Sequence, residues 1–309
     1  MFSRKALVDR AIEFRGESPI PLQVLGDHLK NSDILTYDLS LSAPSNPKLN
    51  EWGFARVKDA AGFWVVPEEP VLDQWKEVDV YQAPPIDPAR RLAGIVKAAT
   101  VCQDRYRLAT FGLSGFSIYR ALRGAKHSEV DCLIEPERFL ELMELIFEFE
   151  TDQFDMIARK GFHGIEFRDD WGERGVSKMT LSLWRILLKH RYAGQFKRAK
   201  ESGLHVWFST SVHCGEFFGD LKEIGVDVVR VDSPRSMEIA SLGRLWRGKL
   251  CFSVRLDEML EGGAIDPEEL KRVVECLSSN GNGFIGLIPE GIPARPCDKV
   301  KNALGKISF

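Results

Sequence analysis

One feature restricts the fold of this chain more than any other. Short apolar runs that end in polar residues alternate with stretches whose apolar residues have helical spacing. Seven runs have the length of strands: Ile20–Leu25, Arg107–Phe111, Gly164–Asp169, His205–Ser209, Val228–Asp232, Leu250–Arg255 and Phe284–Ile288. Strands that alternate with helices form βα units and a parallel sheet. The pattern predicts an α/β protein, a single (β/α)8 TIM barrel formed by residues 1–309.

Helical spacing of apolar residues and helix-end signals occur between these runs. We expect helices over Pro136–Lys160, Leu181–Ser202, Gly215–Ile224 and Pro267–Ser279. Thr180 and Asp266 are suitable N-caps for the second and fourth of them. Gly203 follows the second helix, where a glycine commonly ends one.

The segment 38–90 departs from this alternation because it is rich in proline, tryptophan and charge. Trp52–Gly53, the turn at Gly62 and Phe63–Val66 indicate a hairpin, and Gln82–Arg90 indicates an extended connection. We interpret the segment as an N-terminal elaboration of the barrel and not as a second domain.

Composition excludes several classes of protein. The chain is 44% hydrophobic and 28% charged, as in ordinary globular proteins. Its net charge of -3 gives no basic face for nucleic acid. No apolar run reaches the roughly 18 residues that span a bilayer, and no secretory pattern opens the chain. We expect a cytoplasmic protein with free thiols and no membrane partner.

Two adjacent acids, Asp169 and Asp170, directly follow one of the expected strands. In a (β/α)8 barrel the carboxyl ends of the strands meet at one mouth, where active sites lie. The same mouth would collect polar residues from several strands. The expected ring consists of Asp169, Asp170, Ser209, Ser211, Asp232, Arg255, Asp257 and Glu290.

Such a ring of polar residues could supply general acid–base catalysis. Neighbouring carboxylates raise each other's pKa, so Asp169, Asp170 or Glu290 could be a general acid. Arg255 could hold a substrate carboxylate. The other candidates for substrate binding are Ser209, Ser211, Asp232 and Asp257.

Structural alternatives exist for these residues, and the metal candidates are weak. Asp170 could cap a helix, Asp257 could bridge to Arg255, and the serines could bond to backbone. His213 and Cys214 are adjacent, whereas zinc sites favour spaced ligands. Structural roles are favoured for the remaining candidates, His163, His205, Cys276 and Cys297. We therefore expect no metal site.

Several stretches, in this order and spacing, resemble the uroporphyrinogen decarboxylase superfamily over nearly the whole chain. They are Arg10–Pro21, Asn50–Gly53, Pro67–Trp75, Tyr81–Pro85, Gly164–Gly172, Met179–Trp184, Glu223–Asp227 and Gly283–Pro293. The resemblance implies one barrel with its cleft at the mouth, and a homodimer. One branch of the superfamily decarboxylates a tetrapyrrole. Another transfers methyl groups between small compounds, a corrinoid protein and a thiol cofactor, often with zinc.

The chain departs from the motifs of both branches. Pro19–Leu25 has no arginine where the decarboxylases carry an arginine-rich motif that grips carboxylates, and Glu290 replaces their histidine. Ser32–Leu35 is similar to a decarboxylase motif that contains an aspartate. Ser209–Val212 and Glu290 align with the zinc ligands of the methyltransferases, and hydroxyl groups are poor zinc ligands. Zinc is therefore not expected.

Three functions remain as hypotheses. The first is a methyltransferase-type enzyme for a small methylated or methoxylated compound, with a corrinoid protein as partner and a general acid in the mouth. The second is a decarboxylase of a carboxylated substrate held by Arg255. The third is a non-catalytic barrel that binds a ligand, because a fold does not guarantee an activity.

Overall fold

Eight parallel strands close into a barrel in the computed structural model, which describes residues 2–26, 29–93, 104–171, 179–210, 215–231, 238–261 and 263–307. In order around the barrel the strands are β1 (Leu22–Val24), β12 (Phe284–Ile288), β9 (Cys251–Arg255), β8 (Val228–Val231), β7 (His205–Thr210), β6 (Gly164–Arg168), β5 (Tyr106–Thr110) and β2 (Ile34–Asp38). The predicted (β/α)8 fold is confirmed.

Seven of these strands lie where the alternation of apolar runs predicts them, and β2 was missed. The described part of the connection from β1 to β2 contains only the short 3-10 helix η1 (Leu29–Asn31). No helical pattern therefore separates the two strands in the sequence. The polar residues Thr36 and Asp38 within β2 further weaken its apolar signal.

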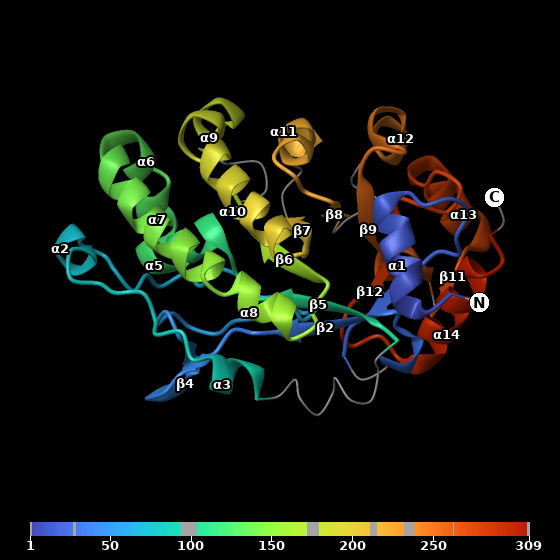
Figure 1. The fold of residues 1–309 in the computed structure, drawn as a ribbon, viewed down its shortest axis with the longest axis horizontal. Coiled ribbons are helices and arrows are strands. Elements are labelled where there is room, and N and C mark those ends of the chain that lie inside the picture. Colours follow the sequence, from blue (N-terminus) through green and yellow to red (C-terminus); the bar gives the residue numbers. More distant parts are fainter. Residues whose placement is uncertain are drawn as a thin grey trace.

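Helices surround the strands (Figure 1). They are α1 (Arg4–Glu13), α2 (Trp75–Val78), α3 (Pro88–Leu92), α5 (Gly115–Ser128), α6 (Asp131–Ile134), α7 (Pro136–Thr151), α8 (Phe154–Arg159), α9 (Leu181–Leu187), α10 (Lys189–Glu201), α11 (Phe218–Glu223), α12 (Ile239–Trp246), α13 (Pro267–Leu277) and α14 (Ala294–Leu304), with the 3-10 turns η2 (Gly215–Phe217) and η3 (Asp257–Met259). Three predicted helices are each divided, into α7 with α8, into α9 with α10, and into η2 with α11. Thr180 and Asp266 are N-caps, as predicted.

The apolar core has two parts. The larger part packs the outer faces of the strands against the helices. The smaller part fills the amino-terminal end of the barrel, where Val8, Ala11 and Ile12 of α1 pack against Tyr106 and other residues that begin strands. Helix α1 thus closes the end opposite to the mouth. None of the helices in the described chain is both long enough and apolar enough to cross a bilayer.

The elaboration lies at the other end of the barrel, away from α1 (Figure 1). It contains an antiparallel hairpin of β3 (Ser42–Ala43) and β4 (Asn46–Asn50), followed by α2 and α3. A second small hairpin, β10 (Leu260–Glu261) with β11 (Ala264–Ile265), follows β9. The elaboration is thus placed where it can contact the mouth.

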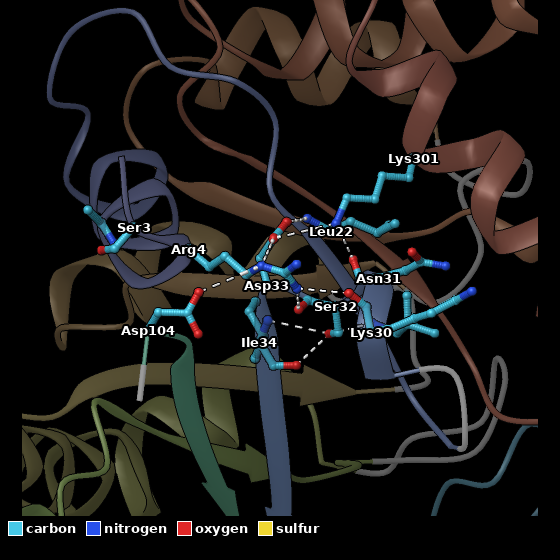
Figure 2. Close-up of polar contacts among 12 residues, drawn as sticks. Ser3, Arg4, Leu22, Lys30, Asn31, Ser32, Asp33, Ile34, Asp104 and Lys301 are labelled. Carbon is cyan, nitrogen blue, oxygen red and sulfur yellow. Dashed lines mark hydrogen bonds and ion pairs between the residues drawn. The ribbon is translucent and has the colours of Figure 1, made fainter. Parts of the chain in front are cut away.

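A polar network reinforces the seam between the first two strands (Figure 2). Strands β1 and β2 are paired at one position only, Gln23 with Ile34. Beside this seam the buried Asp33 accepts a hydrogen bond of 2.9 Å from the backbone N–H of Leu22. The side chains of Arg4 and Lys301 lie 3.9 and 3.8 Å from the same carboxylate. Burial raises the pKa of Asp33, and the two cations oppose this rise.

Asp33→Ala is expected to lower the free energy of unfolding by about 2 kcal/mol, because the buried N–H of Leu22 loses its acceptor. Asp33→Asn keeps an oxygen at this position, so its loss should be smaller. Urea denaturation of the two variants measures the difference. Equal losses would show that the charge of Asp33, and not this hydrogen bond, stabilises the seam.

Candidate functional site

Four polar residues lie side by side across four neighbouring strands inside the barrel. The strand register pairs Arg168 of β6 with Ser209 of β7, Ser209 with Arg230 of β8, and Arg230 with Ser253 of β9. Paired residues of parallel neighbours point to the same side of a sheet. We call this row of Arg168, Ser209, Arg230 and Ser253 the belt. All four are buried, with 7% or less of their surface exposed.

Contacts across the barrel show that the belt faces inward. Arg230 of β8 reaches Gln23 of β1, whose amide oxygen lies 3.5 Å from the guanidinium. Strands β8 and β1 are separated by two others, so this contact crosses the interior. Gln23 in turn donates to the hydroxyl of Thr36 on β2 at 2.7 Å.

Every member of the belt has a buried polar atom without a hydrogen-bond partner among the described residues. These atoms are Arg168 Nη1, Ser209 Oγ, Arg230 Nε and Ser253 Oγ. An unsatisfied buried polar group costs about 1–3 kcal/mol, and a charged group costs more. Four such groups in one row indicate a place suited to the acceptor atoms of a ligand. Ser209 and Ser253 therefore donate no side-chain hydrogen bond to the backbone of the described residues.

The arginines of the mouth differ in their counter-ions. Arg230 pairs with Glu166 at 2.6 Å, and both side chains are buried. Arg255 pairs with Asp257 through contacts of 3.1 and 2.6 Å, which is the bridge that the sequence offered as an alternative. In the described part of the chain, no carboxylate lies within ion-pair distance of Arg168. A buried guanidinium without a counter-ion is costly, so the belt suits an anion.

Part of the elaboration crosses the mouth, and we call residues 58–64 the strap. Lys58 and Trp64 form an antiparallel bridge at its base. The indole N–H of Trp64 donates to Asp38, at the end of β2, at 2.6 Å. The same ring packs against Gly112, just after β5, where a Cβ atom would lie 2.6 Å from Trp64 Cδ1. Gly112 also has φ +83°, so a glycine is required there.

The tip of the strap inserts Phe63 between the three arginines. The guanidinium carbons of Arg168, Arg230 and Arg255 lie 4.5, 5.3 and 5.6 Å from the centroid of its ring. Phe63 is only 6% exposed. Arg168 Nε also donates to the backbone oxygen of Trp64 at 2.9 Å. The strap therefore covers the belt from the side of the mouth.

Two of the predicted acids lie at the carboxyl ends of the strands. Asp170, just after β6, accepts a hydrogen bond of 2.9 Å from Thr210 at the end of β7. Glu290, just after β12, lies 3.6 Å from the ammonium of Lys58 on the strap. Glu290 is nearly half exposed, whereas Asp170 is partly buried. These two acids are therefore suitably placed to exchange protons with a bound ligand or solvent.

Asp169 occupies a different environment, because successive residues of a strand point to opposite faces. It is fully buried and accepts hydrogen bonds from the backbone N–H groups of Phe116 (3.0 Å) and Ser117 (2.7 Å). The hydroxyl of Tyr192 and the indole N–H of Trp171 also donate to it. Burial raises the pKa of Asp169 to about 6, although the bonds from Tyr192 and the backbone oppose the rise. Asp169 thus anchors the start of α5 and does not join Asp170 at the belt.

A second buried acid lies beside this anchor. Glu150 of α7 accepts hydrogen bonds from the backbone N–H of Gly115 (3.2 Å) and the amide of Gln195 (2.5 Å). Burial, with a smaller contribution from the charge of Asp169, raises the pKa of Glu150 to about 8. The folded protein therefore holds a proton on Glu150 at neutral pH.

The proton on Glu150 makes the free energy of unfolding depend on pH, and the direction of this dependence follows from the raised pKa of Glu150. Unfolded Glu150 titrates near 4.5, so its contribution to stability is complete below that pH and is lost as the pH rises through 8. Glu150→Gln cannot ionise. We expect the free energy of unfolding of this variant to gain on the order of 3 kcal/mol relative to wild type between pH 5 and pH 8. Urea denaturation at both pH values tests this, and parallel pH profiles would contradict it.

Several predicted residues lie outside the described part of the chain. They are Ser211, Asp232, His213 and Cys214. Within the described part, no group of three His, Cys, Asp or Glu side chains could hold a metal ion. His163 accepts from the backbone of Arg107 at 3.0 Å, and His205 contacts the hydroxyl of Tyr106, also at 3.0 Å. Both histidines stand at the amino-terminal end of the barrel and act structurally.

The sequence interpretation missed four residues of this site: Arg168, Arg230 and Ser253 of the belt, and Phe63 of the strap. A signal for the two arginines was present. Arg230 is the one charged residue of the apolar strand β8, and Arg168 ends the buried strand β6, which also carries Glu166. A charged residue within a buried strand must face a partner or a ligand. For Phe63 the sequence indicated only a hairpin, and nothing showed that its tip enters the barrel.

Comparison with known proteins supports the fold. No family model matches the sequence, and no curated protein matches it. A methyltransferase from Methanosarcina mazei superimposes with a TM-score of 0.67 over 98% of both chains, at 11% identity. The chain shares the fold of this methyltransferase. The expected barrel is thus confirmed, whereas membership of the uroporphyrinogen decarboxylase superfamily stays a prediction.

Two other solved structures match less well. A Rubisco from Pyrococcus horikoshii has a TM-score of 0.45 at 11% identity, over 98% of this chain and 62% of that one. A D-psicose 3-epimerase has a TM-score of 0.41 at 15% identity, over 71% of this chain and 82% of that one. These two values are too low to bear on the function.

Proposed function

We propose that this protein is an enzyme that binds a small carboxylate at the belt. The observation that carries the proposal is the row of unpartnered, buried polar atoms on Arg168, Ser209, Arg230 and Ser253. A carboxylate offers two oxygens that can accept several hydrogen bonds, and its geometry matches a guanidinium. It would also give Arg168 a negatively charged partner, which this side chain lacks among the described residues.

Methyl transfer from a methylated or methoxylated carboxylate is the first candidate reaction. It is supported by the likeness in fold to a methyltransferase over 98% of both chains. The bond between the methyl carbon and oxygen would break, and Asp170 or Glu290 would give a proton to the departing oxygen. A reduced corrinoid on a partner protein would supply the nucleophile, so the residues of this chain need only hold the substrate and move the proton.

Decarboxylation is the second candidate, and the belt favours it. In the sequence, the lack of arginine in Pro19–Leu25 counts against a tetrapyrrole decarboxylase, and not against a smaller carboxylated substrate. The belt supplies arginines from β6 and β8 instead. In this reaction the bond to the carboxylate carbon would break, carbon dioxide would leave, and Asp170 or Glu290 would protonate the remaining carbon.

Binding is tested first, with benzoate, 4-methoxybenzoate and succinate as probes and benzamide as a neutral control. The proposal predicts that a carboxylate raises the melting temperature and that benzamide does not. If no carboxylate in a broader series of aryl and alkyl acids binds, the proposal is rejected.

For any carboxylate that binds, the products of the reaction then distinguish decarboxylation from methyl transfer. Release of carbon dioxide supports decarboxylation, and a change in corrinoid absorbance with a reduced corrinoid protein supports methyl transfer. Binding with neither product supports the non-catalytic barrel. Asp170→Asn and Glu290→Gln identify the acid, because only the proton donor should lower turnover without weakening binding.

A further inference from the structure

The strap covers polar groups that a ligand would have to reach. Arg168 and Arg230 are 7% and 4% exposed, and each has an unpartnered N–H group. Phe63 lies against both guanidinium groups. An anion can therefore contact the belt from the mouth only after this ring has moved.

The strap is built as a unit that can move. Its turn is closed internally, since the backbone N–H of Asp59 donates to the oxygen of Phe63 (2.9 Å) and that of Gly62 donates to the oxygen of Asp59 (3.1 Å). The Asp59 carboxylate also accepts from the backbone N–H of Phe63 at 2.9 Å. These bonds persist if the strap lifts as a whole.

The contacts between the strap and the barrel, in contrast, all involve a side chain. The polar ones are the bond from Arg168 to the Trp64 oxygen, the bond from Trp64 to Asp38, and the ion pair of Lys58 with Glu290. The apolar ones are the packing of Phe63 on the arginines and of Trp64 on Gly112. The ion pair is close to half exposed on both sides, and such pairs contribute little. No barrel strand pairs with residues 58–64; their one β-bridge joins Lys58 to Trp64. Among the described residues, lifting the strap thus breaks two hydrogen bonds and one half-exposed ion pair, and it exposes the ring of Phe63.

We infer that the strap is a lid, and that Phe63 is the plug that closes the belt when no ligand is present. In the closed state the ring covers the guanidinium faces, which stabilises the cations by cation–π contact. In the open state the ring leaves, and an anion gains access to Arg168 and Arg230. The ligand in this inference rests on the proposed function, but the movement itself can be tested without any ligand.

A covalent lock provides the test. The ammonium of Lys58 lies 3.6 Å from the carboxylate of Glu290, so a carbodiimide can join the two side chains through an amide bond. The cross-link should hold the strap shut, and Lys58→Gln, which cannot form it, is treated in the same way as the control. Phenylglyoxal, which modifies arginine side chains, reports access to Arg168 by mass spectrometry. Arg15, whose side chain is 66% exposed, is the internal control.

We expect Arg168 to be labelled at least 10-fold faster in carbodiimide-treated Lys58→Gln than in the cross-linked protein, with no difference at Arg15. Equal rates at Arg168 would overturn the lid. Phe63→Ala gives a second measurement that needs no cross-link, and it should speed labelling of Arg168 several-fold over wild type. Absence of labelling at Arg168 in wild type and in Phe63→Ala, with Arg15 labelled, would also overturn it. A lid that opens in a protein that binds no carboxylate would reject the proposed function alone.

Discussion

Arg168→Gln is expected to weaken the binding of a small carboxylate about 100-fold and to change the free energy of unfolding of the empty protein by less than about 1 kcal/mol. A charge-assisted hydrogen bond to a buried anion contributes up to about 3 kcal/mol, which corresponds to that loss of affinity. The empty protein loses little, because Arg168 has no carboxylate partner in the described chain and glutamine can still donate to the oxygen of Trp64. Calorimetric titration and urea denaturation measure the two quantities.

Substitutions at two further arginines are the controls for the effect of Arg168→Gln. Arg198→Gln alters an exposed pair between Arg198 of α10 and Asp155 of α8, so both affinity and stability should stay nearly unchanged. Arg230→Gln should reduce both, because it leaves the buried Glu166 without its partner. If Arg168→Gln destabilises the empty protein as strongly as Arg230→Gln and leaves affinity unchanged, Arg168 is structural and the belt is not an anion site.

The strands and helices of the barrel were largely predictable, because their signals are local. Apolar runs such as Phe284–Ile288 and helix ends such as Asp266 are set by neighbours in the sequence. Strand β2 was missed because only the short 3-10 helix η1, and no described α-helix, separates it from β1, so the alternation on which the prediction depended is absent there. Helix division within Pro136–Lys160 has no comparable local signal.

The site was less predictable, because it depends on which face each strand residue occupies and on contacts distant in sequence. Adjacent acids suggested one chemical pair, yet the alternation of the strand sends Asp169 outward to Ser117 and leaves Arg168 in the interior. The belt arises from the register of β6 to β9, which no single strand encodes. Phe63 reaches the arginines over a separation of more than 100 residues from Arg168.

Asp169→Ala is expected to lower the free energy of unfolding by about 4 kcal/mol, the largest effect on stability that we predict. The substitution removes the shared acceptor of four hydrogen bonds, which come from the backbone N–H groups of Phe116 and Ser117, the Tyr192 hydroxyl and the Trp171 indole. A hydrogen bond to a charged group contributes about 1.5–3 kcal/mol. The sum is reduced because Phe116 N–H keeps the Tyr192 hydroxyl at 3.3 Å and Ser117 N–H keeps the Ser114 oxygen at 3.0 Å. Urea denaturation at pH 7 measures the loss.

Two matched variants show whether Asp169 only anchors the start of α5 or also takes part in a reaction. Asp155→Ala removes an exposed acid that also accepts from a serine and an arginine, and it should cost less than about 1 kcal/mol. Asp169→Asn keeps one acceptor oxygen but turns an amide toward groups that are themselves donors, so its loss should be intermediate. This order is expected because the carboxylate holds the start of α5 against β6. An Asp169→Asn variant with unchanged stability and lost turnover would instead place Asp169 in the reaction, because a group that only anchors α5 cannot be weakened without destabilising the fold.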